Sequence, residues 1–150
     1  MTNSVSKGKF VLQQADITQP PAVRAALTCL WLSTGILALL VPAAWANLFG
    51  LPNTASVTVN NLLTLAFMLF VIVKLTAGRG WVRWVFAVVY LMGTGMMLYW
   101  SVVQPQIFRN QALALQVTGL AQLALQTAAV ALLLMPAARQ WFAAQGARSA

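Results

Sequence analysis

The sequence predicts an all-α membrane protein, a polytopic bundle of four transmembrane helices with both termini in the cytoplasm. Three observations predict this class: long runs without charge, basic clusters that separate the runs, and aromatic residues at their ends. Residues 25–73, 84–108 and 110–138 contain no charged side chain. A charge at the bilayer centre costs about 3 kcal/mol or more, so such runs bounded by Lys and Arg are typical of chains that cross a membrane.

The composition excludes a water-soluble domain of this length. Of the 150 residues, 61% are hydrophobic and 7% are charged, and Asp16 is the only Asp or Glu. The net charge of +8 arises from the near absence of acidic residues. The basic residues lie at the ends of apolar segments and form no continuous face that could bind nucleic acid. We therefore expect contact with the lipid bilayer and no binding of nucleic acid.

The chain divides into a membrane domain and two tails. Residues 1–21 are polar and end in Pro20-Pro21, which predicts a flexible cytoplasmic tail. We expect the transmembrane domain over 22–142 and a second cytoplasmic tail over 143–150. The four predicted spans, each near the roughly 20 residues that cross hydrocarbon, are about 23–41, 57–77, 82–103 and 112–135. Pro42, the Gly78-Arg79-Gly80 turn, Pro105 and Pro136 set their ends.

The distribution of Lys and Arg predicts the orientation. With both termini inside, only Arg109 lies outside, and the cytoplasmic cations are Lys7, Lys9, Arg24, Lys74, Arg79, Arg83, Arg139 and Arg148. This bias follows the positive-inside rule. Trp84 and Trp100 agree with it, because the residues between them rise by about 24 Å, close to the distance between two membrane interfaces. We expect a bacterial inner, that is cytoplasmic, membrane.

The N-terminal region also allows a second interpretation. Lys7, Lys9 and Arg24 precede an apolar stretch that ends in Ala44-Trp45-Ala46, a small-x-small pattern of signal-peptidase sites. Cleavage after Ala46 would leave three spans. The apolar stretch is longer than the usual signal core of about 7–15 residues, so we favour an uncleaved first span.

The chain lacks most groups that perform chemistry. It has no His, and its single cysteine, Cys29, lies in an apolar run without a neighbouring cation. A catalytic base for Ser or Thr, a proton relay of buried carboxylates and a set of metal or haem ligands are therefore not to be expected. The sequence predicts a protein that is not an enzyme and has no cofactor.

The remaining polar groups in the spans are amides and hydroxyls. Asn60, Asn61 and Thr64 lie near the outer end of the second span, and spacings of three and four place Thr64 beside either Asn. In the fourth span, Thr118, Gln122 and Gln126 share one helix face with Gln111, Gly119 and Ala129. This polar stripe should face protein. It is either a polar path or partner surface, or a set of interhelical hydrogen bonds worth about 0.6–2 kcal/mol each.

Small residues predict close helix packing. Ala25, Cys29 and Ser33 recur every fourth residue in the first span, and Gly93-Thr94-Gly95 interrupts the third. The glycine triplet is alternatively a flexible point for gating.

The segment 74–84, K-L-T-A-G-R-G-W-V-R-W, predicts a short cytoplasmic turn in which Gly78 and Gly80 permit positive φ. We expect a lipid-interface set of Lys74, Arg79, Arg83, Trp81, Trp84 and Trp100. The G-R-x-W-x-R pattern, together with the C-terminal L-L-L-M-P-A-A-R-Q-W-F, resembles small four-helix inner-membrane proteins of bacteria. The resemblance implies location and architecture, and it brings no catalytic residue.

Two functions from different classes fit the sequence. The first is a non-catalytic protein that acts by helix–helix contact with a membrane partner, as an assembly or regulatory factor or as an immunity protein against a pore-forming toxin. Immunity proteins of pore-forming bacteriocins are similar in size and span count. The second is a small channel or facilitator for a small solute, active as a homo-oligomer and lined by Asn60, Asn61, Thr64, Gln122 and Gln126.

Overall fold

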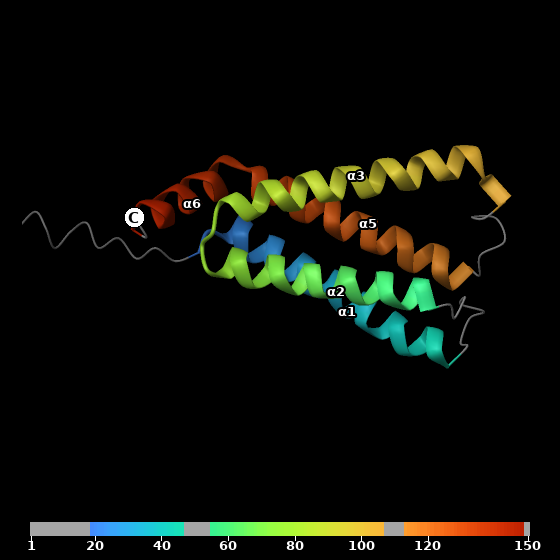
Figure 1. Cartoon of the computed structure of the whole chain (residues 1–150). Helices are drawn as coiled ribbons and strands as arrows, with labels where there is room; N and C mark the ends of the chain where they lie inside the picture. Colours follow the sequence, from blue (N-terminus) through green and yellow to red (C-terminus); the bar gives the residue numbers. More distant parts are fainter. Residues whose placement is uncertain (1–18, 47–54, 107–112, 149–150) are drawn as a thin grey trace, which may run out of the picture.

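The computed structural model describes residues 19–46, 55–106 and 113–148. Its principal elements are the helices α1 (Pro21–Trp45), α2 (Ala55–Thr76), α3 (Trp81–Val103), α5 (Leu113–Leu134) and α6 (Pro136–Arg148) (Figure 1). Helices α1, α2, α3 and α5 each contain a segment long and apolar enough to cross a membrane. The predicted class, an all-α bundle with four spans, is therefore confirmed.

The spans lie close to the expected ranges, and two helices differ from expectation. α1 continues through Pro42 to Trp45, because a proline removes one amide donor but leaves its own carbonyl able to accept. The Ala46 N–H donates to the Pro42 carbonyl at 3.0 Å. α6 was not predicted as a helix, and it occupies residues assigned to the end of the domain and to the C-terminal tail.

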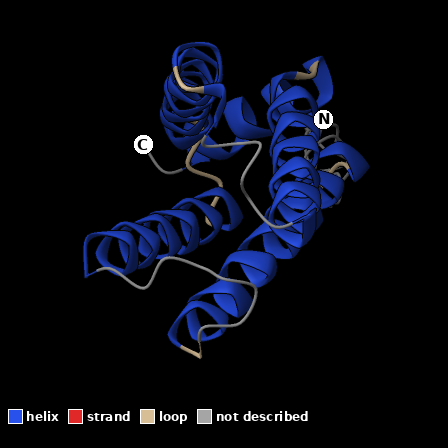
Figure 2. Cartoon of the chain, turned by 90° about the vertical axis from the view of Figure 1, so that its right-hand side faces the viewer, coloured by secondary structure: helices blue, strands red, loops and turns tan. Residues whose placement is uncertain are grey.

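The helices converge at one end of the bundle and diverge at the other (Figure 1). α1 packs most extensively against α5 and next against α2, whereas α3 makes smaller contacts with α2 and α5. α6 follows α5 directly and packs at the converging end, where it also touches α1 (Figure 1). Figure 2, seen from the diverging end, shows the spans separating from one another.

The hydrophobic core is confined to the converging half. It uses the first half of α1, the second half of α2, the first turns of α3, the end of α5 and one face of α6. Its members are Val23, Ala26, Leu27, Leu30, Met68, Val71, Ile72, Leu75, Val82, Phe86, Ala129, Leu133, Ala138, Trp141 and Phe142. We call this half of the molecule the closed end and the opposite half the open end.

Most of each span is not covered by the chain itself. Between 11% and 28% of each span is buried, and large apolar side chains such as Leu39, Met92 and Val102 are exposed. Apolar surface on this scale requires lipid or another protein to cover it. Exposed apolar faces of this extent are those of a membrane-embedded, multi-pass protein.

The described cations gather at the closed end. Arg24 lies in the first turn of α1, Lys74 in the last turn of α2, and Arg79 in the α2–α3 turn. Arg83 and Arg139 lie in the first turns of α3 and α6. The aromatic residues of the predicted interface set divide between the ends: Trp81 and Trp84 are exposed at the closed end and Trp100 at the open end. Lys74 stacks over the Phe70 ring at 5.7 Å.

The α2–α3 turn depends on two glycines for different reasons. Gly78 adopts φ +74°, as a left-handed turn requires, and an added Cβ there would lie 3.0 Å from the Gln145 Cβ of α6. Gly80 was expected to permit positive φ as well, and this was wrong, because its φ is −63°. Gly80 instead permits close approach, since an added Cβ would meet the Phe142 Cβ at 3.2 Å.

Replacing Gly78 by Ala should lower the free energy of unfolding by about 1–2 kcal/mol, the cost of an L side chain in the left-handed region. The measurement is equilibrium unfolding in mixed detergent micelles. Gly146→Ala is the matched control, because Gly146 lies in α6 and an added Cβ there meets nothing within 4 Å. That control should be neutral or slightly stabilising, and a Gly78→Ala variant that matched it would contradict the turn geometry.

Candidate functional site: a cavity between α2, α3 and α5

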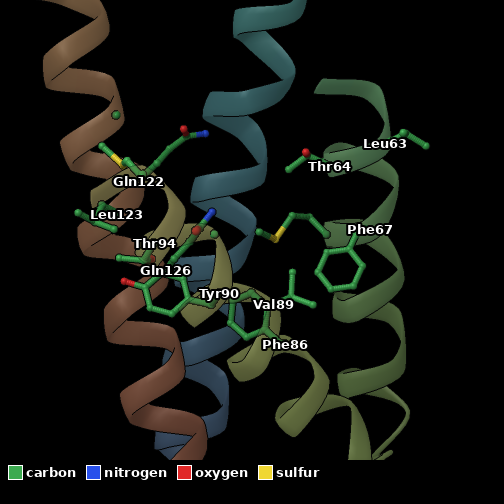
Figure 3. Close-up of a pocket in the computed structure, with 14 residues that line it drawn as sticks. Leu63, Thr64, Phe67, Phe86, Val89, Tyr90, Thr94, Gln122, Leu123 and Gln126 are labelled. Atoms are coloured by element: carbon green, nitrogen blue, oxygen red, sulfur yellow. The ribbon is translucent and has the colours of Figure 1, made fainter. Parts of the chain in front are cut away.

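A cavity of about 520 Å³ lies where α3 diverges from α2 and α5. Figure 3 shows Gln122 and Gln126 on one side of it and Thr64 and Phe67 on the other. Three helices line the cavity with the residues Leu63, Thr64, Phe67, Met68, Phe86, Val89, Tyr90, Gly93, Thr94, Met97, Gly119, Gln122, Leu123 and Gln126. Its volume falls within the range of about 300–1,000 Å³ that is usual for small-molecule sites.

The cavity wall is mainly apolar and carries a few amides and hydroxyls. Phe67, Met68 and Phe86 line the cavity where it adjoins the core. The polar members are Thr64 on α2, Tyr90 and Thr94 on α3, and Gln122 and Gln126 on α5. The lining contains no Asp, Glu, Lys, Arg or His, so the cavity suits neutral groups that can donate or accept hydrogen bonds.

Gln122 and Gln126 also connect α5 to α1. Being four residues apart, they lie on one face of α5. The Gln122 Nε2 donates to the backbone carbonyl of Ser33 at 3.3 Å, and the Gln126 Nε2 donates to the Ser33 Oγ at 3.1 Å. Ser33 is buried, so these two amides supply the interhelical hydrogen bonds that the sequence offered as one interpretation of the stripe.

The other residues singled out in the sequence have different places. Thr64 lines the cavity and donates to the Asn60 carbonyl at 2.8 Å. Asn60 is exposed and Asn61 half-buried, and neither lines the cavity. Thr118 is half-buried and donates to the Leu115 carbonyl at 3.1 Å. Gln111 lies outside the described residues.

Two hydroxyls that sequence reasoning did not select connect α3 with α5. The Tyr90 and Thr127 hydroxyls are 2.5 Å apart, and the Thr127 Oγ1 also lies 2.7 Å from the Leu123 carbonyl. A tyrosine in the middle of a predicted span was the available signal, because a phenol in hydrocarbon needs a partner. This bond joins α3 to α5 on the side of the cavity toward the closed end.

Two glycines leave backbone accessible in the cavity wall. Gly93 of α3 and Gly119 of α5 both line the cavity, and an added Cβ at either position meets nothing within 4 Å. Gly95, two residues further along α3, is equally unobstructed but does not line the cavity. Glycine at such positions permits a neighbouring helix to approach the backbone closely.

Metal-binding clusters are absent from the described parts of the chain, 19–46, 55–106 and 113–148, where no group of three or more His, Cys, Asp or Glu could hold an ion. Cys29 is half-buried and packs against the core. The cavity therefore offers shape, amides and hydroxyls to a ligand or partner.

Fold and cavity together define a class: a multi-pass membrane protein of four apolar spans with a terminal helix packed on one end. No protein-family model, curated protein or solved structure matches this chain.

Proposed function

We propose that the chain is a non-catalytic membrane protein that binds a helix of a membrane partner along the open side of the cavity between α2 and α3. The observation that supports the proposal is the asymmetry of the bundle. One half is closed by a core, and the other half leaves an uncharged cavity whose walls include accessible glycine backbone. The biological role would be that of an assembly or regulatory factor, or of an immunity protein against a pore-forming toxin.

The size of the cavity limits how such a helix binds. A helix with its side chains is about 10–12 Å across, so 520 Å³ accommodates a few side chains and not a whole helix. The partner helix would lie along the opening and insert one or two large side chains past Gly93. The side-chain oxygens of Gln122 and Gln126 remain as acceptors, because their amide nitrogens already donate to Ser33.

The same features support the proposed location. Four apolar spans support a membrane site, and the gathering of the described cations at the closed end supports a cytoplasmic position for that end and for both termini. The bacterial inner membrane remains the proposed membrane.

Gly93→Leu tests the partner site directly. A leucine there should fill the cavity from α3 and reduce recovery of a copurifying membrane protein at least about tenfold, as loss of a central interface contact does. The measurement is purification from native membranes in mild detergent with quantitative mass spectrometry of proteins in near-stoichiometric amount. Gly95→Leu is the matched control on the same helix and should leave recovery unchanged. Equal recovery from both variants would contradict the proposal.

A channel or facilitator for a small solute is the second candidate, and one observation favours it. Thr64, Gln122 and Gln126, three of the five lining residues expected for it, border the same cavity. In that case the chain would purify as a homo-oligomer without a partner, and proteoliposomes would show solute flux that Gln122→Leu alters at unchanged expression. A partner protein would show no flux.

A further inference from the structure

We propose that Arg83 and Arg139 together bind a phosphate group at the closed end of the bundle, where the first turn of α3 meets α6. This site is separate from the cavity and does not depend on the function proposed for it. The ligand chemistry is that of an anionic phosphoester, and an anionic phospholipid headgroup is its source in a membrane.

The first argument is an excess of buried donors over acceptors. Among the described residues, the buried side-chain atoms without a hydrogen-bond partner are the Nε and Nη1 of Arg83 and the Nε1 of Trp141. All three are N–H donors; Arg83 of α3 meets α6 at the Phe142 ring, and Trp141 is the residue before Phe142 on α6. Buried donors are almost always paired in proteins, so this contact lacks acceptors.

The second argument is the position of the Arg83 guanidinium. Its central carbon lies 5.7 Å from the Trp84 ring and 5.5 Å from the Phe142 ring. Trp141 packs edge-to-face on Phe142, with ring centroids 4.8 Å apart. Nε and Nη1 of Arg83 are buried, whereas Nη2 is not. These two aromatic contacts therefore restrain the guanidinium and leave its Nη2 edge available to a ligand.

The third argument is charge. Arg139 lies three residues before Phe142 on α6, so it projects from the same helix face as the ring that packs on Arg83, and the two cations repel each other. No Asp or Glu occurs in residues 19–46, 55–106 or 113–148, so no described side chain neutralises the pair. Two neighbouring guanidiniums without an acid form a favourable site for a phosphate, which accepts several charge-assisted hydrogen bonds at once.

The position in the bundle favours a lipid as the source of the phosphate. Trp81 and Trp84, both exposed, flank Arg83 in the first turn of α3, and exposed tryptophans at the end of a span mark the headgroup level. A phosphate in this layer would reach the arginine pair without entering the apolar core.

The test is retention of phosphatidylglycerol by the full chain, measured by native mass spectrometry after release from nanodiscs of mixed phosphatidylglycerol and phosphatidylcholine. Arg83→Gln and Arg139→Gln should each lower phosphatidylglycerol binding about tenfold, as expected for loss of a hydrogen bond to a charged group. The double variant should lose little more than either single variant, because the two arginines act as one site.

Arg79→Gln is the matched control, since Arg79 is exposed in the adjacent turn. It should change phosphatidylglycerol binding less than about fivefold, the effect of one cation near an anionic surface. Equal losses for Arg79→Gln and Arg83→Gln, adding independently, would overturn the site in favour of diffuse attraction. Arg139 is exposed, so Arg139→Gln carries the test even where Arg83→Gln disturbs the packing of α6.

A second arm separates the two sources of phosphate. In nanodiscs of phosphatidylcholine alone, inorganic phosphate is titrated and its binding followed by calorimetry. Competition between phosphate and phosphatidylglycerol that requires both arginines supports a shared site. Phosphate binding that requires both arginines but is indifferent to phosphatidylglycerol assigns the site to a free anion. Binding of neither probe, or binding that survives both substitutions, overturns the proposal.

Discussion

Replacing Ser33 by Leu is expected to lower the free energy of unfolding by about 2–4 kcal/mol. Ser33 is 1% exposed and lies between α1 and α5, the pair of helices with the most extensive contact. An oversized side chain at a packed position costs about 1–3 kcal/mol, and the lost bond from Gln126 adds about 0.6–1.7 kcal/mol in a membrane bundle. Equilibrium unfolding in mixed micelles measures the difference.

Two further substitutions separate the contributions. Ser33→Ala removes the hydroxyl and keeps the space, so it should cost about 0.6–1.7 kcal/mol. The bond from Gln122 goes to the backbone carbonyl of Ser33 and is retained in that variant. Gly35→Leu adds the same leucine on the exposed side of α1, where nothing lies within 4 Å of an added Cβ, and should cost nothing. A Ser33→Leu variant as stable as Gly35→Leu would show that α1 and α5 do not pack closely here.

The spans were predictable from the sequence because their signal is local. A charge-free apolar run flanked by cations identifies a span whatever its neighbours are. α6 has no such signal: it is 13 residues long, begins at Pro136 and mixes Arg and Gln with Ala. Pro136 was interpreted as the end of the fourth span, although proline is also common at the first position of a helix. What selects the helix is the burial of Trp141 and Phe142 against the closed end, which is tertiary information.

Of the candidate site, the sequence predicted only the polar face of the fourth span. Spacing places Gln122 and Gln126 on one face of α5, but it does not identify the acceptor, which is Ser33 on a helix 93 residues away from Gln126. The cavity opens where α3 diverges from α2 and α5, beyond the end of the hydrophobic core. The spacing of apolar residues in the sequence does not predict where that core ends. Thr94 was noted only as part of the glycine triplet, and Tyr90 was not selected although a phenol within a span was a signal. Asn60 and Asn61 were selected for polarity and lie outside the cavity wall.

Replacing Phe142 by Ala is expected to release α6 from the closed end while the spans remain folded. Phe142 is 2% exposed, and it contacts the α2–α3 turn at Gly80, the Arg83 guanidinium and the Trp141 ring. Removing a buried phenylalanine costs about 3–5 kcal/mol. A helix of 13 residues has little stability of its own in water, so a loss of this size should open it locally.

Hydrogen exchange of the full chain in nanodiscs measures this opening. In Phe142→Ala the amides of α6 should exchange at close to the unprotected rate, while those in the buried parts of α1 and α2 should keep their protection. Gln140→Ala, on the exposed side of α6, should leave α6 protected. Loss of protection throughout α1 and α2 in Phe142→Ala would contradict local release and make α6 part of the cooperative core. Unchanged protection of α6 would mean that Ala138 and Trp141 suffice to hold it, and that the ring of Phe142 serves chiefly as the support on which Arg83 rests.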